Sequence, residues 1–336
     1  MPQLANVKQQ LFVLKDHQFT DGSDPEVKNL HKLVQSINGQ TFSTMTMHPG
    51  ETQLWRFTNQ SANLIFNIAL KGHRFRIIET DGVVTNQEKQ VDTLELLPAG
   101  RLEVLVDAGA AGTYDLVSPH TMTGVGDKMT EERVLGQLTV EGTQESTLAT
   151  QTAFPEKVDW RTKKIDTYRT IVYSQSYDKK SDDMSYYING QMFDHNRIDT
   201  RVPLGNIEEW TIKNNTDDFH SFHIHQIHFQ VAEINGKPQP FDNYVDTVRI
   251  PERGEVKLIL PFVDPQIVGT FVYHCHVLEH EDKGMMQQIE VYDPKESPIR
   301  RWWHDMFSCC SSMKFSGGCF GSNIRRLWWS LTTKQI

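Results

Sequence analysis

Short stretches in which apolar and polar residues alternate recur along most of the chain. They are rich in β-branched and aromatic residues and are bounded by Gly, Pro, Asn or Asp, which is typical of β-strands. The clearest are TQLWRFTN, RFRIIE, LEVLVD, EEWTIKN, HFQVAEI and VKLILPF. No long stretch with a 3.6-residue period interrupts them before the C-terminal tail. The pattern therefore predicts an all-β protein built from β-sandwiches.

The two halves of the chain match each other. INGQ, followed closely by Phe, occurs at 37–42 and again at 188–193, and each copy precedes Gly, Glu, Trp and Asn in the same order. VDT occurs twice, and a GTY in the first half corresponds to a GTF in the second. The matching positions are separated by a nearly constant offset of one domain length. We therefore expect two homologous sandwiches, and we place four segments along the chain: 1–145 without metal ligands, a polar linker at 146–166, 167–294 with them, and a tail at 295–336.

Composition narrows the possible partners. The 336 residues are 38% hydrophobic and 23% charged, which leaves enough apolar residues for two cores. The formal charge of −9 and the absence of long basic runs exclude nucleic acid and argue against an anionic membrane surface. The N-terminus lacks the apolar centre of a signal peptide, and no stretch is long enough for a transmembrane helix.

Histidines gather in two short segments of the second half, HSFHIHQIHF and FVYHCHVLEHEDKGMM. Residues two apart in a strand share a face, so His223 and His225 should project together, as should His274 and His276. Cys275 should point to the opposite face. The sequence thus predicts one segment that presents a thiolate to one metal and two imidazoles to other metals.

The residue types around the cysteine are those of a blue copper site, which uses two His, one Cys and a weak axial Met. Cys275, His280 and Met285 supply three of these ligands from one loop, and His220 is the candidate for the fourth. A structural zinc site would need a closed set of four ligands and no trailing methionine. Met286 is an alternative to Met285, although the spacing favours Met285.

The internal repeat provides a control for these clusters. Phe66, Ala69 and Lys71 stand where the second half has its first three histidines, and Val-Ser-Pro at 117–119 stands where it has His-Cys-His. The scaffold is kept in both halves but the clusters occur in one, so structural need alone does not explain them. We interpret His228 as a surface residue or one that supports the cluster. The remaining histidines are interpreted as ordinary core or surface residues: His17, His31, His48, His73, His120, His195 and His304.

These segments resemble the copper motifs of multicopper oxidases, the family of laccases, ascorbate oxidases and bacterial cuprous oxidases. The family pattern His-Cys-His-x3-His-x4-Met is matched in full from His274 to Met285. The pattern His-Pro-x-His-x-His-Gly is matched at its three histidines, with Ser221 replacing the proline and Gln226 the glycine. The resemblance covers about residues 8 to 294. It implies two tandem cupredoxin-like Greek-key sandwiches, the second and third of a three-domain enzyme.

The resemblance also implies roles for individual residues. It assigns copper ligands at eight positions: His220, Cys275, His280 and Met285 to type 1, His223 to type 2, and His225, His274 and His276 to type 3. Cys275 would also carry electrons onward, and Glu281 matches a position that relays protons, although it could equally be a solvated loop carboxylate. The implied reaction couples four one-electron oxidations of a small-molecule reductant or cuprous ion to reduction of dioxygen to water.

One departure from the family is large. The trinuclear centre of the family takes eight histidines, four of them from two His-x-His pairs in the first domain. This chain has two His-x-His pairs, and both are already assigned. We therefore expect that the first domain is absent, so that either a second chain supplies the missing half or the chain is a fragment that cannot reduce dioxygen by itself. The rival interpretations are a blue-copper electron-transfer or copper-binding fragment without oxidase turnover, and a degenerate fragment without copper. The family resemblance suggests a periplasmic or secreted location.

The tail from 295 onward matches nothing expected of the family. It holds four of the seven Trp and three of the four Cys. Tryptophans beside arginines could mark an interfacial segment, and cysteine-rich tracts can bind metal. The lack of regular spacing favours a third interpretation, a non-family extension or an out-of-frame read-through.

Overall fold

The computed structural model describes residue 4 and residues 6–18, 33–119, 131–149 and 154–296. The described residues up to Tyr292 form one compact unit. Almost all of the predicted tail therefore lies outside the described residues. Within the part of the chain that is described, no helix is long and apolar enough to cross a membrane.

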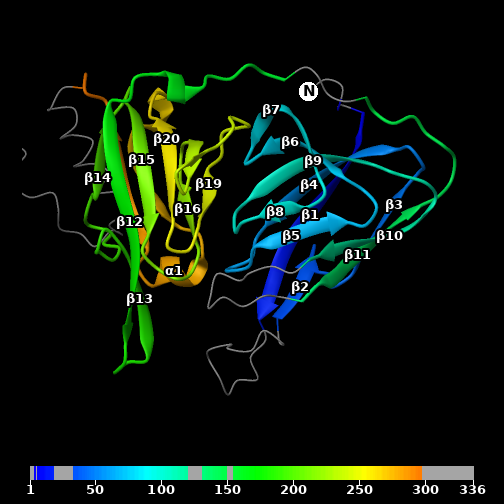
Figure 1. Cartoon of the computed structure of the whole chain (residues 1–336), viewed down its shortest axis with the longest axis horizontal. Coiled ribbons are helices and arrows are strands. Elements are labelled where there is room, and N and C mark those ends of the chain that lie inside the picture. Colours follow the sequence, from blue (N-terminus) through cyan, green and yellow to red (C-terminus); the bar gives the residue numbers. More distant parts are fainter. Residues whose placement is uncertain (1–3, 5, 19–32, 120–130, 150–153, 297–336) are drawn as a thin grey trace, which may run out of the picture. The chain divides into compact units, whose positions relative to one another are not determined.

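Two β-sheets form in the first half of the chain (Figure 1). One has six strands in the order β2-β1-β4-β9-β6-β7, and the other has five in the order β3-β11-β10-β5-β8. The strands are β1 (Lys8–Gln18), β2 (Leu33–Ile37), β3 (Ser43–Met47), β4 (Thr52–Asn59), β5 (Phe66–Leu70), β6 (Phe75–Thr80), β7 (Val83–Val91), β8 (Leu94–Leu96), β9 (Arg101–Asp107), β10 (Gly112–Ser118) and β11 (Arg133–Val140).

The second half repeats this arrangement strand for strand. Its six-stranded sheet has the order β13-β12-β15-β20-β17-β18, and its five-stranded sheet has the order β14-β22-β21-β16-β19. The strands are β12 (Thr167–Asp178), β13 (Asp183–Ile188), β14 (Thr200–Pro203), β15 (Ile207–Asn214), β16 (His220–Ile224), β17 (Gln230–Ile234), β18 (Lys237–Pro238), β19 (Thr247–Ile250), β20 (Glu255–Pro261), β21 (Gly269–Cys275) and β22 (Met286–Tyr292). The predicted all-β class and the internal repeat are confirmed.

The INGQ sequence makes the same tight turn in both halves. Asn38 and Gly39 have φ of +52° and +78°, and Asn189 and Gly190 have +52° and +74°. Two successive residues with positive φ define a type I′ turn, for which Asn-Gly is the favoured pair. Each asparagine also accepts a backbone hydrogen bond from the neighbouring strand, β1 or β12. The repeated sequence is therefore explained by a repeated backbone requirement.

Each half has its own hydrophobic core with a tryptophan at its centre. Trp55 and Trp210 are fully buried. The indole N–H of Trp210 donates to Glu208 at 2.8 Å, and that of Trp55 donates to Gln53 at 3.1 Å. A buried indole N–H needs such a partner, which accounts for the polar residue two positions before each tryptophan.

Helical structure in the described residues is confined to short segments. The 3-10 helices are η3 (Trp160–Thr162) and η4 (Pro265–Ile267), and the α-helix is α1 (Leu278–Asp282). The five residues of α1 fall between the Cys and Met of the second histidine segment, where no helix was expected. Residues 146–149 contact the first half and η3 contacts the second, but the domain boundaries at 145, 166 and 294 stay a prediction.

Candidate metal centre

The pairing of β16 with β21 places the two histidine segments side by side. His223 lies opposite His274, and Phe222 lies opposite Cys275. Side chains alternate along a strand, so His220 falls on the same face as Cys275, while the two paired histidines share the other face. Two groups of side chains result, one on each face of the sheet.

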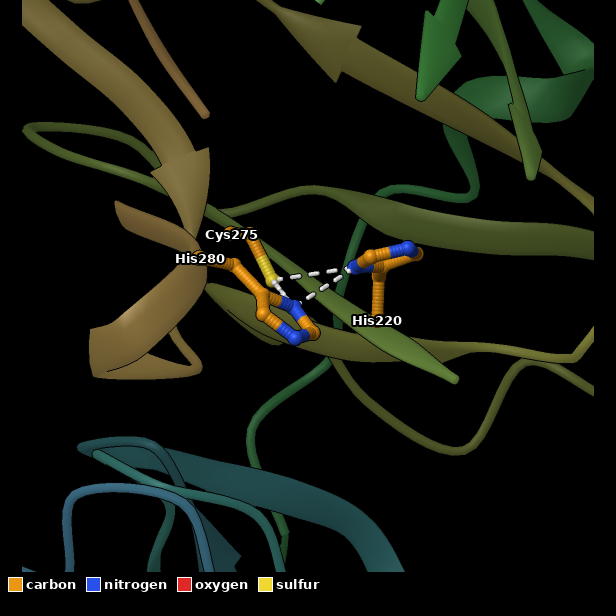
Figure 2. A group of neighbouring side chains, drawn as sticks. All are labelled: His220, Cys275 and His280. Carbon is orange, nitrogen blue, oxygen red and sulfur yellow. Dashed lines mark hydrogen bonds between the residues drawn. The ribbon is translucent and has the colours of Figure 1, made fainter. Parts of the chain in front are cut away.

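The first group, called here the thiolate cluster, consists of His220, Cys275 and His280. Figure 2 shows these side chains converging from β16, β21 and α1. The sulfur of Cys275 lies 3.5 Å from Nδ1 of His220 and 3.6 Å from Nδ1 of His280. The two Nδ1 atoms are 2.9 Å apart, and all three side chains are fully buried.

The donor atoms of this group fit copper. Two Nδ1 atoms and one sulfur meet at a single point, which is the soft donor set of a blue copper site. Burial lowers the pKa of His280 to about 3 and that of His220 well below its usual value. Both imidazoles are therefore neutral at neutral pH, as a metal ligand must be. Burial raises the pKa of the Cys275 thiol to about 12, so metal binding has to displace its proton.

Met285 lies next to this group through the backbone. The Cys275 N–H donates to the Met285 carbonyl at 3.0 Å, and the Met285 N–H donates to the His280 carbonyl at 2.9 Å. The Met285 side chain is fully buried in the same core as Cys275, whereas Met286 is partly exposed. These two hydrogen bonds join the ends of the loop from Cys275 to Met285, and the Met285 side chain lies on the side of the loop that faces the core.

The second group, called here the imidazole cluster, consists of four histidines on the opposite face. Ligand atoms of His223, His225 and His274 lie within 4.8 Å of one another. The ring of His276 lies 5.3 Å from that of His223 and 5.2 Å from that of His274. Burial, and then the neighbouring imidazoles, lower the pKa of His276 to about 4.

Hydrogen bonds fix which nitrogen of His223 faces a metal. Its Nδ1 lies 2.9 Å from the backbone oxygen of Asp246 and 2.9 Å from the hydroxyl of Thr247. That hydroxyl donates to the Asp246 carboxylate, so it accepts from His223. His223 therefore carries its proton on Nδ1, and Nε2 is left with a free lone pair.

Glu281 likewise contacts one ring nitrogen of His274 and leaves the other facing the imidazole cluster. Its carboxylate lies 3.1 Å from Nδ1 of His274, and Nε2 of that ring faces Nε2 of His225 at 3.4 Å. Burial raises the pKa of Glu281, but the hydrogen bond and charge of His274 outweigh it and hold the pKa below its usual value. Glu281 is half-buried and makes a defined contact with the imidazole cluster through His274.

Two residues that support the ligands, Thr216 and Thr247, are not predicted from the sequence. Thr216 bonds to Nε2 of His220 at 2.8 Å. A signal was present, since Asn59 and Ser61 in the first half correspond to Asn214 and Thr216 in the second. In both halves the hydroxyl donates to the asparagine. What the sequence could not show is that the second copy also reaches a histidine.

The other histidines lie apart from both groups in the described part of the chain. His228 bonds through Nε2 to the backbone oxygen of Asp81, and His195 is exposed. His31, His120 and His304 lie outside the described residues.

Comparison with known proteins identifies the family to which this chain belongs. Multicopper oxidase family models match residues 6–142 and 158–295. The chain belongs to the multicopper oxidase family. Copper is therefore its cofactor, and the thiolate and imidazole clusters are the candidate groups that hold it. The membership agrees with the predicted cupredoxin-like sandwiches and with the resemblance seen in the sequence.

The individual relatives carry names that describe different functions. "Multicopper oxidase mco" of Staphylococcus aureus is 28% identical over 292 residues, covering 85% of this chain and 58% of the relative. A "Laccase" of Bacillus subtilis is 23% identical, covering 77% and 54%. "Cell division protein FtsP" of Pectobacterium atrosepticum is 27% identical, covering 76% and 54%. The chain thus spans a little over half the length of these relatives.

Solved structures agree on the fold. A multicopper oxidase from Campylobacter jejuni, described as a metallo-oxidase, superposes with a TM-score of 0.70 at 22% identity. It covers 87% of this chain, which in turn spans 65% of that protein. A multicopper oxidase from Pediococcus acidilactici gives a TM-score of 0.62 at 25% identity, covering 86% of this chain and 60% of that one.

Proposed function

We propose that this chain forms the electron-accepting part of a laccase-like multicopper oxidase that reduces dioxygen to water. One observation carries the proposal. The thiolate cluster and the imidazole cluster lie on opposite faces of β21, and Cys275 is covalently continuous with both His274 and His276. A plain electron carrier would have no use for imidazoles on both sides of its cysteine.

The proposed ligands are those that the family pattern assigns, and the two clusters are compatible with them. They are His220, Cys275, His280 and Met285 for type 1 copper, His223 for type 2, and His225, His274 and His276 for the type 3 pair. Copper bound at these positions would accept single electrons from a reductant and deliver them to dioxygen. Overall, four electrons and four protons convert one dioxygen into two water molecules.

The residues around the ligands hold them in the binding tautomer. Thr216 accepts the Nε2 proton of His220, which leaves Nδ1 beside the Cys275 sulfur. The backbone oxygen of Asp246 accepts the Nδ1 proton of His223. Such outer contacts orient the rings and raise their basicity, and their loss typically weakens metal binding about 10- to 100-fold.

Glu281 is proposed to carry protons to the imidazole cluster. Its carboxylate touches Nδ1 of His274. It is half-buried, so it is in contact with both solvent and the imidazole cluster. These two contacts, rather than its lowered pKa, suit a group that delivers protons while dioxygen is reduced.

The imidazole cluster contains four rings in the described part of the chain, half of the eight expected for a family trinuclear centre. Completion would need ligands from another segment or a second chain. This observation keeps one alternative open, a blue-copper electron-transfer or copper-binding protein without oxidase turnover. The reductant is proposed to be a small molecule or cuprous ion, and a periplasmic or secreted location stays a prediction.

The first test is the copper content and colour of the purified chain. About four copper atoms per chain, a blue spectrum and dioxygen uptake with a reductant are expected if the chain completes its trinuclear centre by itself. About one copper with a blue spectrum and no dioxygen uptake would mean a type 1 copper protein whose oxidase partner is missing, and would favour the electron-transfer alternative for the chain alone. A colourless chain that does not bind copper would overturn both.

A further inference from the structure

Tyr186 lies flat against the imidazole of His280. The ring centroids are 4.2 Å apart and the planes meet at 26°. Tyr186, on β13, is 3% exposed, and His280 is fully buried. The outward nitrogen of His280, Nε2, is also buried and has no hydrogen-bond partner. His280 therefore offers a reductant neither an exposed edge nor a polar contact. His220 is equally buried, but its Nε2 has a partner inside the protein, the hydroxyl of Thr216.

The segment that carries Tyr186 is fastened to the loop that carries Met285. The Tyr186 N–H donates to the Lys283 carbonyl at 3.2 Å, and the Phe193 N–H donates to the Gly284 carbonyl at 3.0 Å. The Lys283 ammonium also pairs with Asp183 at the start of β13, at 2.8 Å. Three contacts spread along residues 183–193 therefore hold this segment over α1 as a cover.

Gly284 permits the close approach of the cover. Its φ is +115°, and a Cβ placed there would lie 2.8 Å from the Tyr186 carbonyl oxygen and 2.9 Å from the terminal carbon of Met192. Both distances are shorter than real Cβ contacts, so a side chain at this position would push the cover away. The glycine thus serves the packing of Tyr186 over the site as well as the turn before Met285.

We propose that Tyr186 is a specificity-determining residue that closes His280 to reductants that must contact its imidazole. A phenol that reduces copper by touching the imidazole would need the edge that is buried here. A donor that transfers its electron across the protein surface, without a bond or hydrogen bond to His280, would still work. In each transfer the donor loses one electron, and the cupric ion held by the thiolate cluster gains it. The inference rests on the proposed function.

The cover can be tested without copper by acylating histidines with diethylpyrocarbonate and mapping the sites by mass spectrometry. In the copper-free wild-type chain we expect His280 to react at least about tenfold more slowly than the exposed His195. Tyr186→Ala should raise the His280 rate by about tenfold or more, and Tyr186→Phe should not. The matched control is Tyr187→Ala, because Tyr187 points to the other face of β13 and bonds to Ser176. Equal rates for His280 and His195 in the wild type would overturn the proposal.

The copper-loaded chain gives an independent readout, the anaerobic rate at which the blue colour is lost. Tyr186→Ala should speed reduction by hydroquinone about tenfold, while reduction by ferrocyanide changes less than about twofold. Equal acceleration of both reductants, or of neither, overturns the proposal. If Tyr186→Ala does not fold, both measurements are repeated on Tyr186→Leu, whose side chain is larger than alanine. A chain that never turns blue contradicts the proposed function, whereas the acylation result still decides whether the cover exists.

Discussion

The hydroxyl of Thr216 joins the scaffold to the thiolate cluster, because it lies 2.7 Å from Oδ1 of Asn214 and 2.8 Å from Nε2 of His220. A hydroxyl has one proton, and the asparagine oxygen can only accept it. Thr216 must therefore accept from Nε2–H of His220. The tautomer of this ring is thereby set, with Nδ1 unprotonated and facing Cys275.

Thr216→Ala should lower the affinity of the blue site for copper about 10- to 100-fold, since the ring loses its orienting partner. It also leaves a buried N–H unpaired, at a cost of about 1–3 kcal/mol in the free energy of unfolding. Copper affinity is measured by competition with a chelator while the blue band is followed. Thr216→Ser should retain wild-type affinity. Ser61→Ala, the matching change in the first half, should lower stability without affecting copper; an equal loss of affinity there would contradict the assignment.

Cys275→Ser should abolish the blue absorption, because that absorption arises from the copper–thiolate bond. The serine hydroxyl replaces a fully buried sulfur beside two imidazoles, so the variant should also lose about 1–3 kcal/mol of stability while still folding. Absorption spectra of the copper-loaded variant and near-ultraviolet circular dichroism check the two effects. A variant that stays blue would show that another sulfur binds the metal.

His223→Ala should leave the blue colour intact and lower the total copper per chain. His223 lies on the imidazole face, and its own partners are Asp246 and Thr247 rather than the thiolate cluster. Dioxygen uptake, where the wild type shows it, should fall below detection. The control is His195→Ala, an exposed histidine that should change none of the three measurements. Loss of colour in His223→Ala would contradict the separation of the two faces.

Glu281→Gln should slow dioxygen reduction about 10- to 100-fold and leave the blue spectrum unchanged. The amide can still contact His274 but cannot take up a proton. Glu279→Gln is a matched control on the same helix, because Glu279 pairs with Lys283 instead. Rates are compared from pH 5 to 8 for both variants. Identical profiles would remove Glu281 from the proton path.

Gln226→Gly should raise the free energy of unfolding by about 0.5–1 kcal/mol. Gln226 is exposed and has φ of +65°, a left-handed conformation that costs a non-glycine residue about 1–2 kcal/mol. This is the position at which the family pattern has glycine. Gln191→Gly, at an exposed glutamine without positive φ, should be neutral or destabilising. Urea unfolding of the copper-free chain measures both, and a loss of stability in Gln226→Gly would contradict the strain.

The parts of this site that the sequence predicts are those governed by local periodicity. Alternation along β21 alone separates Cys275 from its flanking histidines, and the repeat alone predicts matching strands in both halves. The supporting contacts of Thr247 and Tyr186 depend on strands that come together from distant parts of the chain, so no local pattern reveals them. Helix α1 was missed because five residues are too few to show a helical period.

The alternation along β21 also constrains how this chain can change through evolution. A substitution there alters one side chain, but the gain or loss of a single codon would turn every following residue to the other face of the sheet. Cys275 would then lie among the imidazoles, and the histidines would enter the apolar core. The segment from Tyr273 to His276 therefore tolerates no change in length, whereas the tip of the hairpin at 179–182 can vary in length without disturbing either cluster.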